Sequence, residues 1–239
     1  MSKCSRSVAD GRVNKQYNKS MLDISVVILA SGTGSRLGTR TPKQFINYQG
    51  KPLLEWSLAF FNDLDFVKEI ILVLSEEYLD KVNSFIALEN YSKVHIVKGG
   101  DTRQISSFNG LKAVAADYVF IHDAARPNID ADTVNRIVKQ LKFYKAVVPC
   151  IPSCNTIYQL GAEGEVVKVL ERVSLGIVQT PQAFKTKLIR EAHEKAKAEN
   201  KIDFTDDAGM LLQYQLGKVK TVVGDENNFK VTYKNDFLV

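Results

Sequence analysis

The sequence predicts an α/β protein built on one open, mostly parallel sheet. Short apolar runs recur along the chain, and segments with helical spacing lie between them. This alternation is typical of parallel strands joined by right-handed helical crossovers. A length of 239 residues, 45% of them apolar and 25% charged, is ordinary for a globular protein and large enough for a substantial core.

Five apolar runs are expected to form buried parallel strands. They are residues 24–30, 70–74, 94–97, 118–121 and 146–151. Two segments between them have apolar residues at helical spacing. The first contains Ile105, Phe108, Leu111 and Ala115, and the second contains Val134, Ile137, Val138 and Leu141 with Asp130 placed to cap it.

Residues 152–172 interrupt this rhythm. Two short β-like pieces, Thr156–Leu160 and Glu165–Leu170, flank a turn at Gly161–Gly164. Their apolar side chains would need a partner surface if the hairpin projected from the domain. Two interpretations stay open: an arm that contributes to dimerisation, or a hairpin folded on its own domain.

The remaining organisation is simple. Residues 22–239 are expected to form one domain that includes this arm. Residues 1–21 are basic and almost devoid of apolar side chains, which indicates a disordered tail or a remnant of expression cloning. An organelle-targeting peptide is the alternative for this segment.

Composition excludes several classes of protein. The net charge of +5 suits a phosphate-rich small substrate, although surplus lysine also serves solubility. No basic block with interleaved aromatic residues indicates nucleic acid, and no run approaches the roughly 18 apolar residues of a membrane span. The three cysteines, Cys4, Cys150 and Cys154, are an odd number without metal-site spacing. They favour free thiols in a cytoplasmic location.

A glycine-rich loop, LASGTGSRLG, follows the first expected strand. Gly32 and Gly34 allow the backbone to approach closely, so that its amides can point at phosphate oxygens. Leu37 stands where a dinucleotide-binding motif needs its third glycine, and no P-loop triplet follows. Arg36 and Lys43 flank the loop, where two cations would neutralise a triphosphate during attack at phosphorus. Either residue alone could be an ordinary solvated charge.

Polar stretches follow three of the expected strands. They are Ser31–Lys43, Gly99–Asp101 and His122–Pro127. Ligands of open α/β sheets bind beyond the carboxyl ends of the strands, so these stretches are expected to form one site. Asp123 is a hard oxygen donor suited to Mg²⁺, with an ion pair to Arg126 as the alternative.

Three residues of these regions, and Thr205 further along the chain, carry individual predictions. Arg126 itself fits a phosphate contact, because a guanidinium matches phosphate oxygens. His122 is expected to be a packed strand residue. Asp101 and Thr205 could instead be helix N-caps.

Six motifs occur in a characteristic order: LASGTGSRLG with PKQF, GGDTRQIS, HDAARP, QTPQAF, FTDDA and FKVT. In this order and spacing the chain resembles the 2-C-methyl-D-erythritol 4-phosphate cytidylyltransferases over about residues 24–236. The resemblance implies a Rossmann-like fold, a homodimer and a requirement for Mg²⁺. It also implies transfer of CMP from CTP to the sugar phosphate, with release of pyrophosphate, in non-mevalonate isoprenoid biosynthesis.

The resemblance assigns roles to individual residues. Arg36 and Lys43 would stabilise the transition state, while Arg172 and Lys230 would align the acceptor phosphate. The implied CTP site consists of Ala30, Ser31, Gly32, Gly34, Arg36, Lys43, Gly100, Asp101, Ser106, Asp123, Ala124 and Lys230. The implied sugar-phosphate site consists of Asp123, Arg126, Thr156, Arg172 and Thr180. The arm would carry Thr156 and Arg172 into the neighbouring subunit.

Three features depart from the family pattern. Ser31 replaces the usual alanine, and the segment Asn155–Tyr158 lacks the charges that usually begin the hairpin. The chain ends at Val239, before the usual final helix, which suggests a truncated chain or the first half of a fusion.

Alternative functions remain within and beyond this class. The close rival is a ribitol 5-phosphate cytidylyltransferase, which resembles HDSVRP where this chain has Ala124 and Ala125. A nicotinamide dehydrogenase is disfavoured by Leu37 and by the apolar end of the second strand. A non-catalytic nucleotide-binding protein is disfavoured because Arg36, Lys43 and Lys230 are all present.

Overall fold

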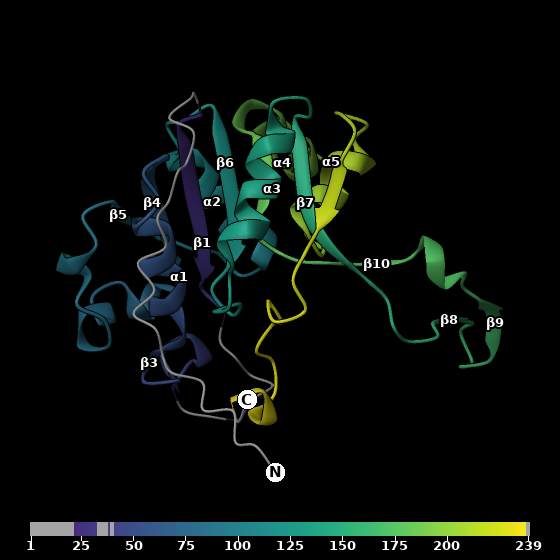
Figure 1. The fold of residues 1–239 in the computed structure, drawn as a ribbon, viewed down its shortest axis with the longest axis horizontal. Coiled ribbons are helices and arrows are strands. Elements are labelled where there is room, and N and C mark those ends of the chain that lie inside the picture. The colour runs from purple at the N-terminus through teal and green to yellow at the C-terminus, as the bar shows by residue number, and fades with distance from the viewer. Residues whose placement is uncertain (1–21, 33–37, 39–40, 238–239) are drawn as a thin grey trace, which may run out of the picture.

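The computed structural model describes residues 22–32, 38 and 41–237. The expected tail therefore lies outside the described residues, as do Gly34 and Arg36 of the glycine-rich loop. An eight-stranded sheet forms the centre, in the order β10-β7-β11-β6-β1-β4-β5, with β12 beside β7 (Figure 1). Its strands are β1 (Ile24–Ala30), β4 (Val67–Leu74), β5 (Val94–Lys98), β6 (Tyr118–Asp123), β7 (Ala146–Pro152), β10 (Gly176–Val178), β11 (Gln182–Lys185) and β12 (Lys220–Val223).

The sheet is mostly parallel, as predicted. β1 pairs in parallel with β4 and β6, and β4 pairs in parallel with β5. β11 inserts antiparallel between β6 and β7, so β7 runs in the same direction as β6 but forms its parallel pairing with β12. The expectation that residues 94–97 form a buried strand was wrong. β5 is the edge strand, and its side chains are half-buried or exposed because no strand covers its outer side.

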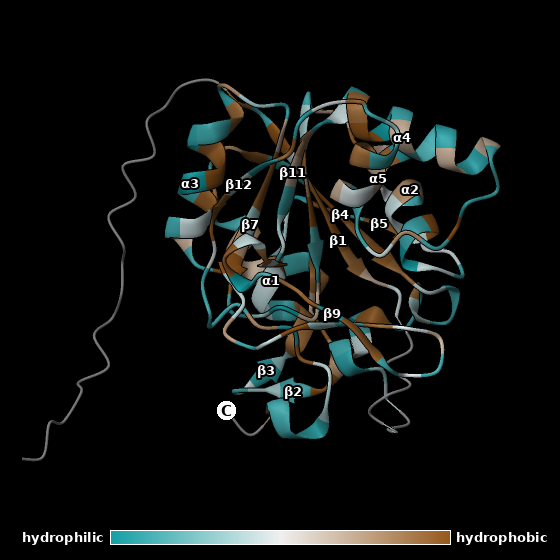
Figure 2. Ribbon diagram, turned by 90° about the vertical axis from the view of Figure 1, so that its right-hand side faces the viewer, coloured by the Kyte–Doolittle hydropathy of each residue, from teal (hydrophilic) through white to brown (hydrophobic). Residues whose placement is uncertain are grey.

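Helices cover both faces of the sheet. They are α1 (Leu53–Asn62), α2 (Arg103–Ala113), α3 (Ala131–Leu141), α4 (Thr186–Ala198) and α5 (Asp207–Gln213). α1 and α3 pack on one face, and α2, α4 and α5 pack on the other (Figure 2). Side chains of β1 alternate between these two cores: Val26 and Ile28 face α1 and α3, while Val27 faces α2.

The helix N-caps agree with one prediction and differ from two others by one residue. Asp130 caps α3 as expected, because its Oδ1 accepts a hydrogen bond from the Thr133 amide at 2.7 Å. The suggested caps at Asp101 and Thr205 were each one residue early: Thr102 caps α2 and Asp206 caps α5. Among the described residues, no helix is long and apolar enough to span a bilayer.

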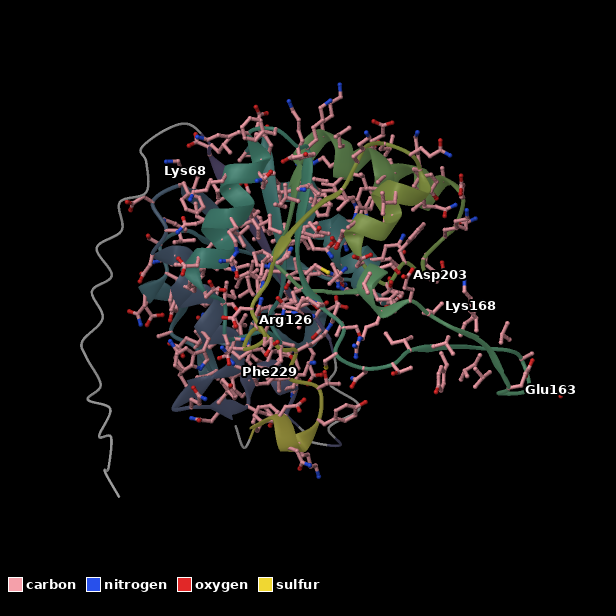
Figure 3. All side chains as sticks on the ribbon, turned by 45° about the vertical axis from the view of Figure 1, so that its right-hand side comes forward. Lys68, Arg126, Glu163, Lys168, Asp203 and Phe229 are labelled. Atoms are coloured by element: carbon pink, nitrogen blue, oxygen red, sulfur yellow. The ribbon has the colours of Figure 1, made fainter. Side chains whose placement is uncertain are left out.

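Two small hairpins lie outside the main sheet. β2 (Asn47–Tyr48) and β3 (Lys51–Pro52) precede α1, while β8 (Tyr158–Leu160) and β9 (Val166–Val169) form the predicted hairpin at 152–172. This second hairpin projects from the body as an arm, and all residues of β8 and β9 are exposed (Figure 1). Figure 3 shows Glu163 and Lys168 far out on it. The alternative of a hairpin folded on its own domain is therefore wrong.

Candidate active site

A cavity of about 630 Å³ opens at the carboxyl ends of β1 and β6. Its walls include the three polar stretches that were expected to converge, together with residues near Lys230. The residues of the implied CTP site that line it are Ala30, Ser31, Gly32, Lys43, Gly100, Asp101, Asp123, Ala124 and Lys230. The predicted convergence of strand ends is therefore confirmed for the part of the chain that the structure describes.

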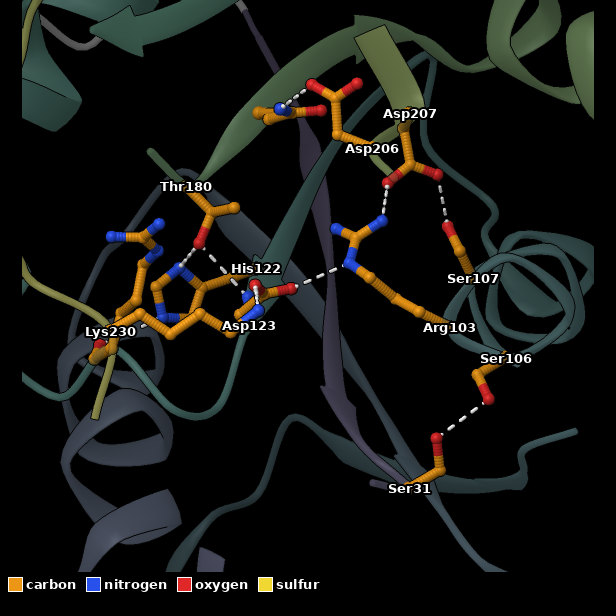
Figure 4. A network of polar contacts seen from close by, with 12 residues as sticks. Ser31, Arg103, Ser106, Ser107, His122, Asp123, Thr180, Asp206, Asp207 and Lys230 are labelled. Carbon is orange, nitrogen blue, oxygen red and sulfur yellow. Dashed lines mark hydrogen bonds and ion pairs between the residues drawn. The ribbon is translucent and has the colours of Figure 1, made fainter. Parts of the chain in front are cut away.

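One wall of the cavity is a compact hydrogen-bonded contact between two loops. The Ser31 hydroxyl donates to Ser106 Oγ at 2.7 Å, and the Gly100 amide donates to the same oxygen at 3.0 Å (Figure 4). The loops approach so closely that a Cβ at Gly99 would lie 2.6 Å from Ser31 Cβ. The Ser106 side chain thus lies behind this wall and supports it through these bonds. Ser31 adds a hydrogen bond that the alanine usual in the family could not form.

The opposite wall is a chain of charges centred on Asp123. Its Oδ1 accepts a hydrogen bond from Arg103 Nε at 3.0 Å, and its Oδ2 accepts one from Lys230 Nζ at 2.6 Å (Figure 4). Burial alone would raise the pKa of Asp123, but the two cations outweigh it and hold the pKa well below its usual 3.8. Asp123 is therefore ionised, and its ion-pair partners are Arg103 and Lys230 instead of the suggested Arg126.

His122 and Thr180 support Asp123 from inside the domain. His122 Nε2 faces the carbonyl of Arg126 at 3.1 Å, so this nitrogen carries the proton. Its Nδ1 consequently accepts the Thr180 hydroxyl at 2.9 Å, and Thr180 Oγ1 accepts the Asp123 amide at 3.1 Å. Burial lowers the pKa of His122 to about 3, so the ring is neutral and packed as expected. Thr180 is 4% exposed and lies behind the cavity wall.

Lys43 reaches the cavity from a short 3-10 helix, Lys43–Phe45, that follows Pro42. The neighbouring Gln44 side chain is buried and donates to the Ala30 carbonyl at 2.7 Å, which fixes this helix against the end of β1. Lys43 Nζ donates to the Val231 carbonyl at 2.9 Å. The segment that carries Lys230 therefore lies across the cavity from the loop after β1.

The implied sugar-phosphate residues are not assembled within one chain. Of the five, only Asp123 lines the cavity. The Arg126 guanidinium donates to the backbone carbonyl of Asn228 at 2.7 Å, and Figure 3 shows it in the body of the domain. Thr156 and Arg172 are exposed on the arm, where Arg172 Nη1 donates to the Cys154 carbonyl at 3.3 Å.

Sequence reasoning missed Arg103, which joins Lys43 and Lys230 as a cation among the described residues that line the cavity. It stands inside the GGDTRQIS motif, yet its ion-pair partners lie 20 and 104 positions away. No local spacing could have connected them. Gln44 and Thr232 also line the cavity without having been singled out.

This arrangement suits the binding of a polyphosphate. Lys43, Arg103 and Lys230 supply charge, and the backbone of the glycine-containing loops supplies amide donors. No histidine or cysteine occurs among the described residues that line the cavity, so it offers no nucleophile–histidine pair. The described lining is suited to charge neutralisation and positioning.

Comparison with known proteins leads to the same conclusion. The family description "2-C-methyl-D-erythritol 4-phosphate cytidylyltransferase" matches residues 24–239. The enzyme of that name from Aquifex aeolicus is 42% identical over 212 residues, which cover 89% of this chain and 93% of the relative. The D-ribitol-5-phosphate cytidylyltransferase of Xenopus tropicalis is 35% identical over 224 residues, which cover 89% of this chain and 54% of the relative.

A solved structure shares the fold. The crystal structure of the 4-diphosphocytidyl-2C-methyl-D-erythritol synthase from Anaerococcus prevotii has a TM-score of 0.80 and 30% identity, and the match covers 91% of this chain and 93% of that one. Motifs, cavity and fold thus agree over nearly the whole chain. It belongs to the 2-C-methyl-D-erythritol 4-phosphate cytidylyltransferase family.

Proposed function

We propose that this chain transfers CMP from CTP to 2-C-methyl-D-erythritol 4-phosphate and releases pyrophosphate. One observation carries the proposal: Lys43 and Lys230 line a single cavity that Ser31 and Gly100, both bonded to Ser106, also line, in the fold of this enzyme family. The cations suit the triphosphate. The small polar wall suits a pyrimidine ring.

The reaction needs no general base. A phosphate oxygen of the acceptor forms a bond to the α-phosphorus of CTP, while the bond from that phosphorus to the bridging oxygen breaks. Pyrophosphate leaves with the electron pair. Because the acceptor is an anion at neutral pH, catalysis consists of positioning and charge stabilisation. Lys43, Lys230 and Arg36 (outside the described residues) would carry the charge that develops on the phosphoryl oxygens.

The residues present fit a magnesium ion held mainly by the nucleotide. The described part of the chain contains no cluster of three metal-binding side chains. Asp123 is an ionised carboxylate on the cavity wall and would be the protein's own hard oxygen donor. When bound, Mg²⁺ supplies further neutralisation of the phosphates.

The arm supports a homodimer. Its exposed apolar side chains include Ile157, Leu160, Val166, Val167 and Val169. An exposed apolar hairpin of this kind needs a covering surface, and a second copy would provide it. In such a dimer Thr156 and Arg172 would reach the partner's cavity and complete the sugar-phosphate site. We further propose a cytoplasmic location, because an odd number of cysteines favours a reducing compartment.

Pyrophosphate release tests the function directly. The full chain is incubated with CTP, Mg²⁺ and either methylerythritol phosphate or ribitol 5-phosphate. Ala124 and Ala125 line the cavity and favour the first acceptor, so we expect turnover with methylerythritol phosphate. Turnover with ribitol 5-phosphate alone would instead support a ribitol 5-phosphate cytidylyltransferase, the function named for the similar Xenopus tropicalis enzyme.

A further inference from the structure

A buried carboxylate, Asp207, lies behind the charged wall of the cavity and has no part in the reaction described above. It begins α5, and its side chain is 1% exposed. Figure 4 shows it on the far side of Arg103 from Asp123. A buried carboxylate is costly unless it is paired with a cation and fully hydrogen-bonded.

Three donors saturate Asp207. Its Oδ2 accepts Arg103 Nη1 at 2.8 Å, and its Oδ1 accepts Ser107 Oγ at 2.6 Å and His193 Nε2 at 2.9 Å. Burial would raise the pKa of Asp207, yet the charge of Arg103 and the bond from His193 hold it below its usual 3.8. Asp207 is thus a fixed negative charge.

The scaffold around Asp207 leaves it little freedom. Its partners come from α2 and α4, while the carboxylate itself comes from α5. The His193 ring stacks flat on Phe108, with centroids 5.4 Å apart and an interplanar angle of 3°. Asp206 caps α5 by accepting the Gly209 amide at 2.9 Å. Three helices therefore set the place of one carboxylate.

Arg103 links the fixed carboxylate of Asp207 to the cavity. Its Nη1 is held by Asp207 and its Nε by Asp123, so both edges of the guanidinium plane are anchored. Within the described residues its Nη2 donates to no protein group, and Arg103 lines the cavity with 25% of its side chain exposed. The clamp leaves the free N–H groups on the cavity wall.

We propose that Asp207 is a positioning residue that acts through Arg103, fixing this guanidinium as a CTP contact on the cavity wall, with Ser107 and His193 as its support. The inference rests on the proposed function, because it assumes that CTP occupies the cavity. It extends the site by a cation and by a carboxylate that never touches the substrate.

A role of Asp207 through its charge and a role in positioning Arg103 predict opposite changes in CTP affinity. If Asp207 acted only through its charge, Asp207→Asn would make the cavity more positive and tighten CTP binding. If it positions Arg103, the same variant keeps a single acceptor oxygen for three donors and removes the charge that holds Nη1, so Arg103 is held less firmly and CTP binding and turnover both weaken. Weakening of this charge-assisted bond predicts a fall of roughly tenfold in kcat/KM for CTP.

The experiment is a double-mutant cycle on the full chain, with kcat/KM for CTP from pyrophosphate release and CTP affinity from calorimetry. The variants are Asp207→Asn, Arg103→Ala and their combination. Glu69→Gln is the matched control, because Glu69 also accepts a hydroxyl and an amide but lies near the opposite ends of the strands. We expect no change in kcat/KM for this control.

The cycle separates positioning from stability. We expect Asp207→Asn to lower kcat/KM in the wild-type background and to have no further effect in the Arg103→Ala background. An unchanged kcat/KM, tighter CTP binding, or equal losses in both backgrounds would overturn the proposal. If Asp207→Asn fails to fold, Ser107→Ala takes its place in the same cycle, with a smaller loss expected. Wild-type protein without turnover would refute the proposed function itself.

Discussion

The cavity and the arm differ in how their side chains are paired and exposed. Around the cavity, polar side chains are paired with one another: Asp123 and Asp207 both bind Arg103, and Asp123 also binds Lys230. On the arm, apolar side chains are exposed, with Val167 at 60% and Leu160 at 59%. The described charges of the cavity wall pair within a single chain, whereas the arm presents surface that no described residue of this chain covers.

This difference separates the nucleotide-binding part of the proposed site from the part that would bind the acceptor. In the proposed function the nucleotide side of the site is preorganised, because the charges of Asp123, Arg103 and Lys230 are fixed by one another. The acceptor side would depend on Thr156 and Arg172, which are exposed on the arm and do not line the cavity of their own chain. Substitutions in the two regions should therefore fail in different ways.

The largest effect is expected at the preorganised site. Lys43→Ala removes an ammonium group from the cavity, and loss of a comparable donor to a developing charge typically lowers kcat by about 10²-fold or more. Steady-state pyrophosphate release measures it. Lys68→Ala is the control, because Lys68 is a surface lysine that pairs with Asp23 at 3.5 Å and donates to the Asp65 carbonyl, and it does not line the cavity. Near-wild-type turnover of Lys43→Ala would remove this lysine from the mechanism.

The buried charges should make the stability of this region dependent on pH. The folded-state pKa of Asp207 is lowered, so its contribution is full above its ordinary value of 3.8 and is lost as the pH falls below it. Asp207→Asn breaks a buried ion pair and is expected to cost about 3 kcal/mol at neutral pH. Thermal unfolding at several pH values measures the difference between the two proteins, which should shrink below pH 3.8. A difference that grows on acidification would contradict the assigned ionisation.

The arm is expected to act on the cavity of the partner chain. Arg172→Ala is expected to lower kcat/KM for the acceptor roughly 10- to 100-fold, because it removes one bond to a charged group. Mixing this variant with Lys43→Ala sharpens the comparison. In a mixed dimer, the intact arm of one chain would meet the intact cavity of the other. One site of two would then be complete in half of the dimers, giving roughly a quarter of wild-type activity.

The outcome of this mixing experiment separates the two arrangements. Activity that stays at the level of the single variants would show that the arm serves its own chain. Lys168→Ala is the control for the arm, since Lys168 is exposed on β9 and has no assigned contact with substrate. It should leave both the activity and the complementation unchanged.

What could be predicted from the sequence follows the same division. Strands such as β1 and β6 were predictable because their apolar runs reflect burial on both faces. β11 was missed, because QAFK is short and half polar, and its place between β6 and β7 is decided by tertiary pairing. The loops that line the cavity were found through glycine and charge at strand ends. Arg103 was not, because its ion pairs join residues distant in sequence.

The smallest effect is expected where the two regions meet. Cys150 lies in β7, opposite Val178 of β10, at the root of the arm, and burial raises the pKa of its thiol. The thiol is therefore protonated at neutral pH and a poor nucleophile. Cys154 is exposed, but only its backbone carbonyl contacts Arg172. Initial rates with and without a reducing agent should agree, and Cys154→Ser should match the wild type. A strong dependence on reductant that disappears in Cys154→Ser would mean that this thiol controls how the arm presents Arg172, and the arm would then be a regulated element.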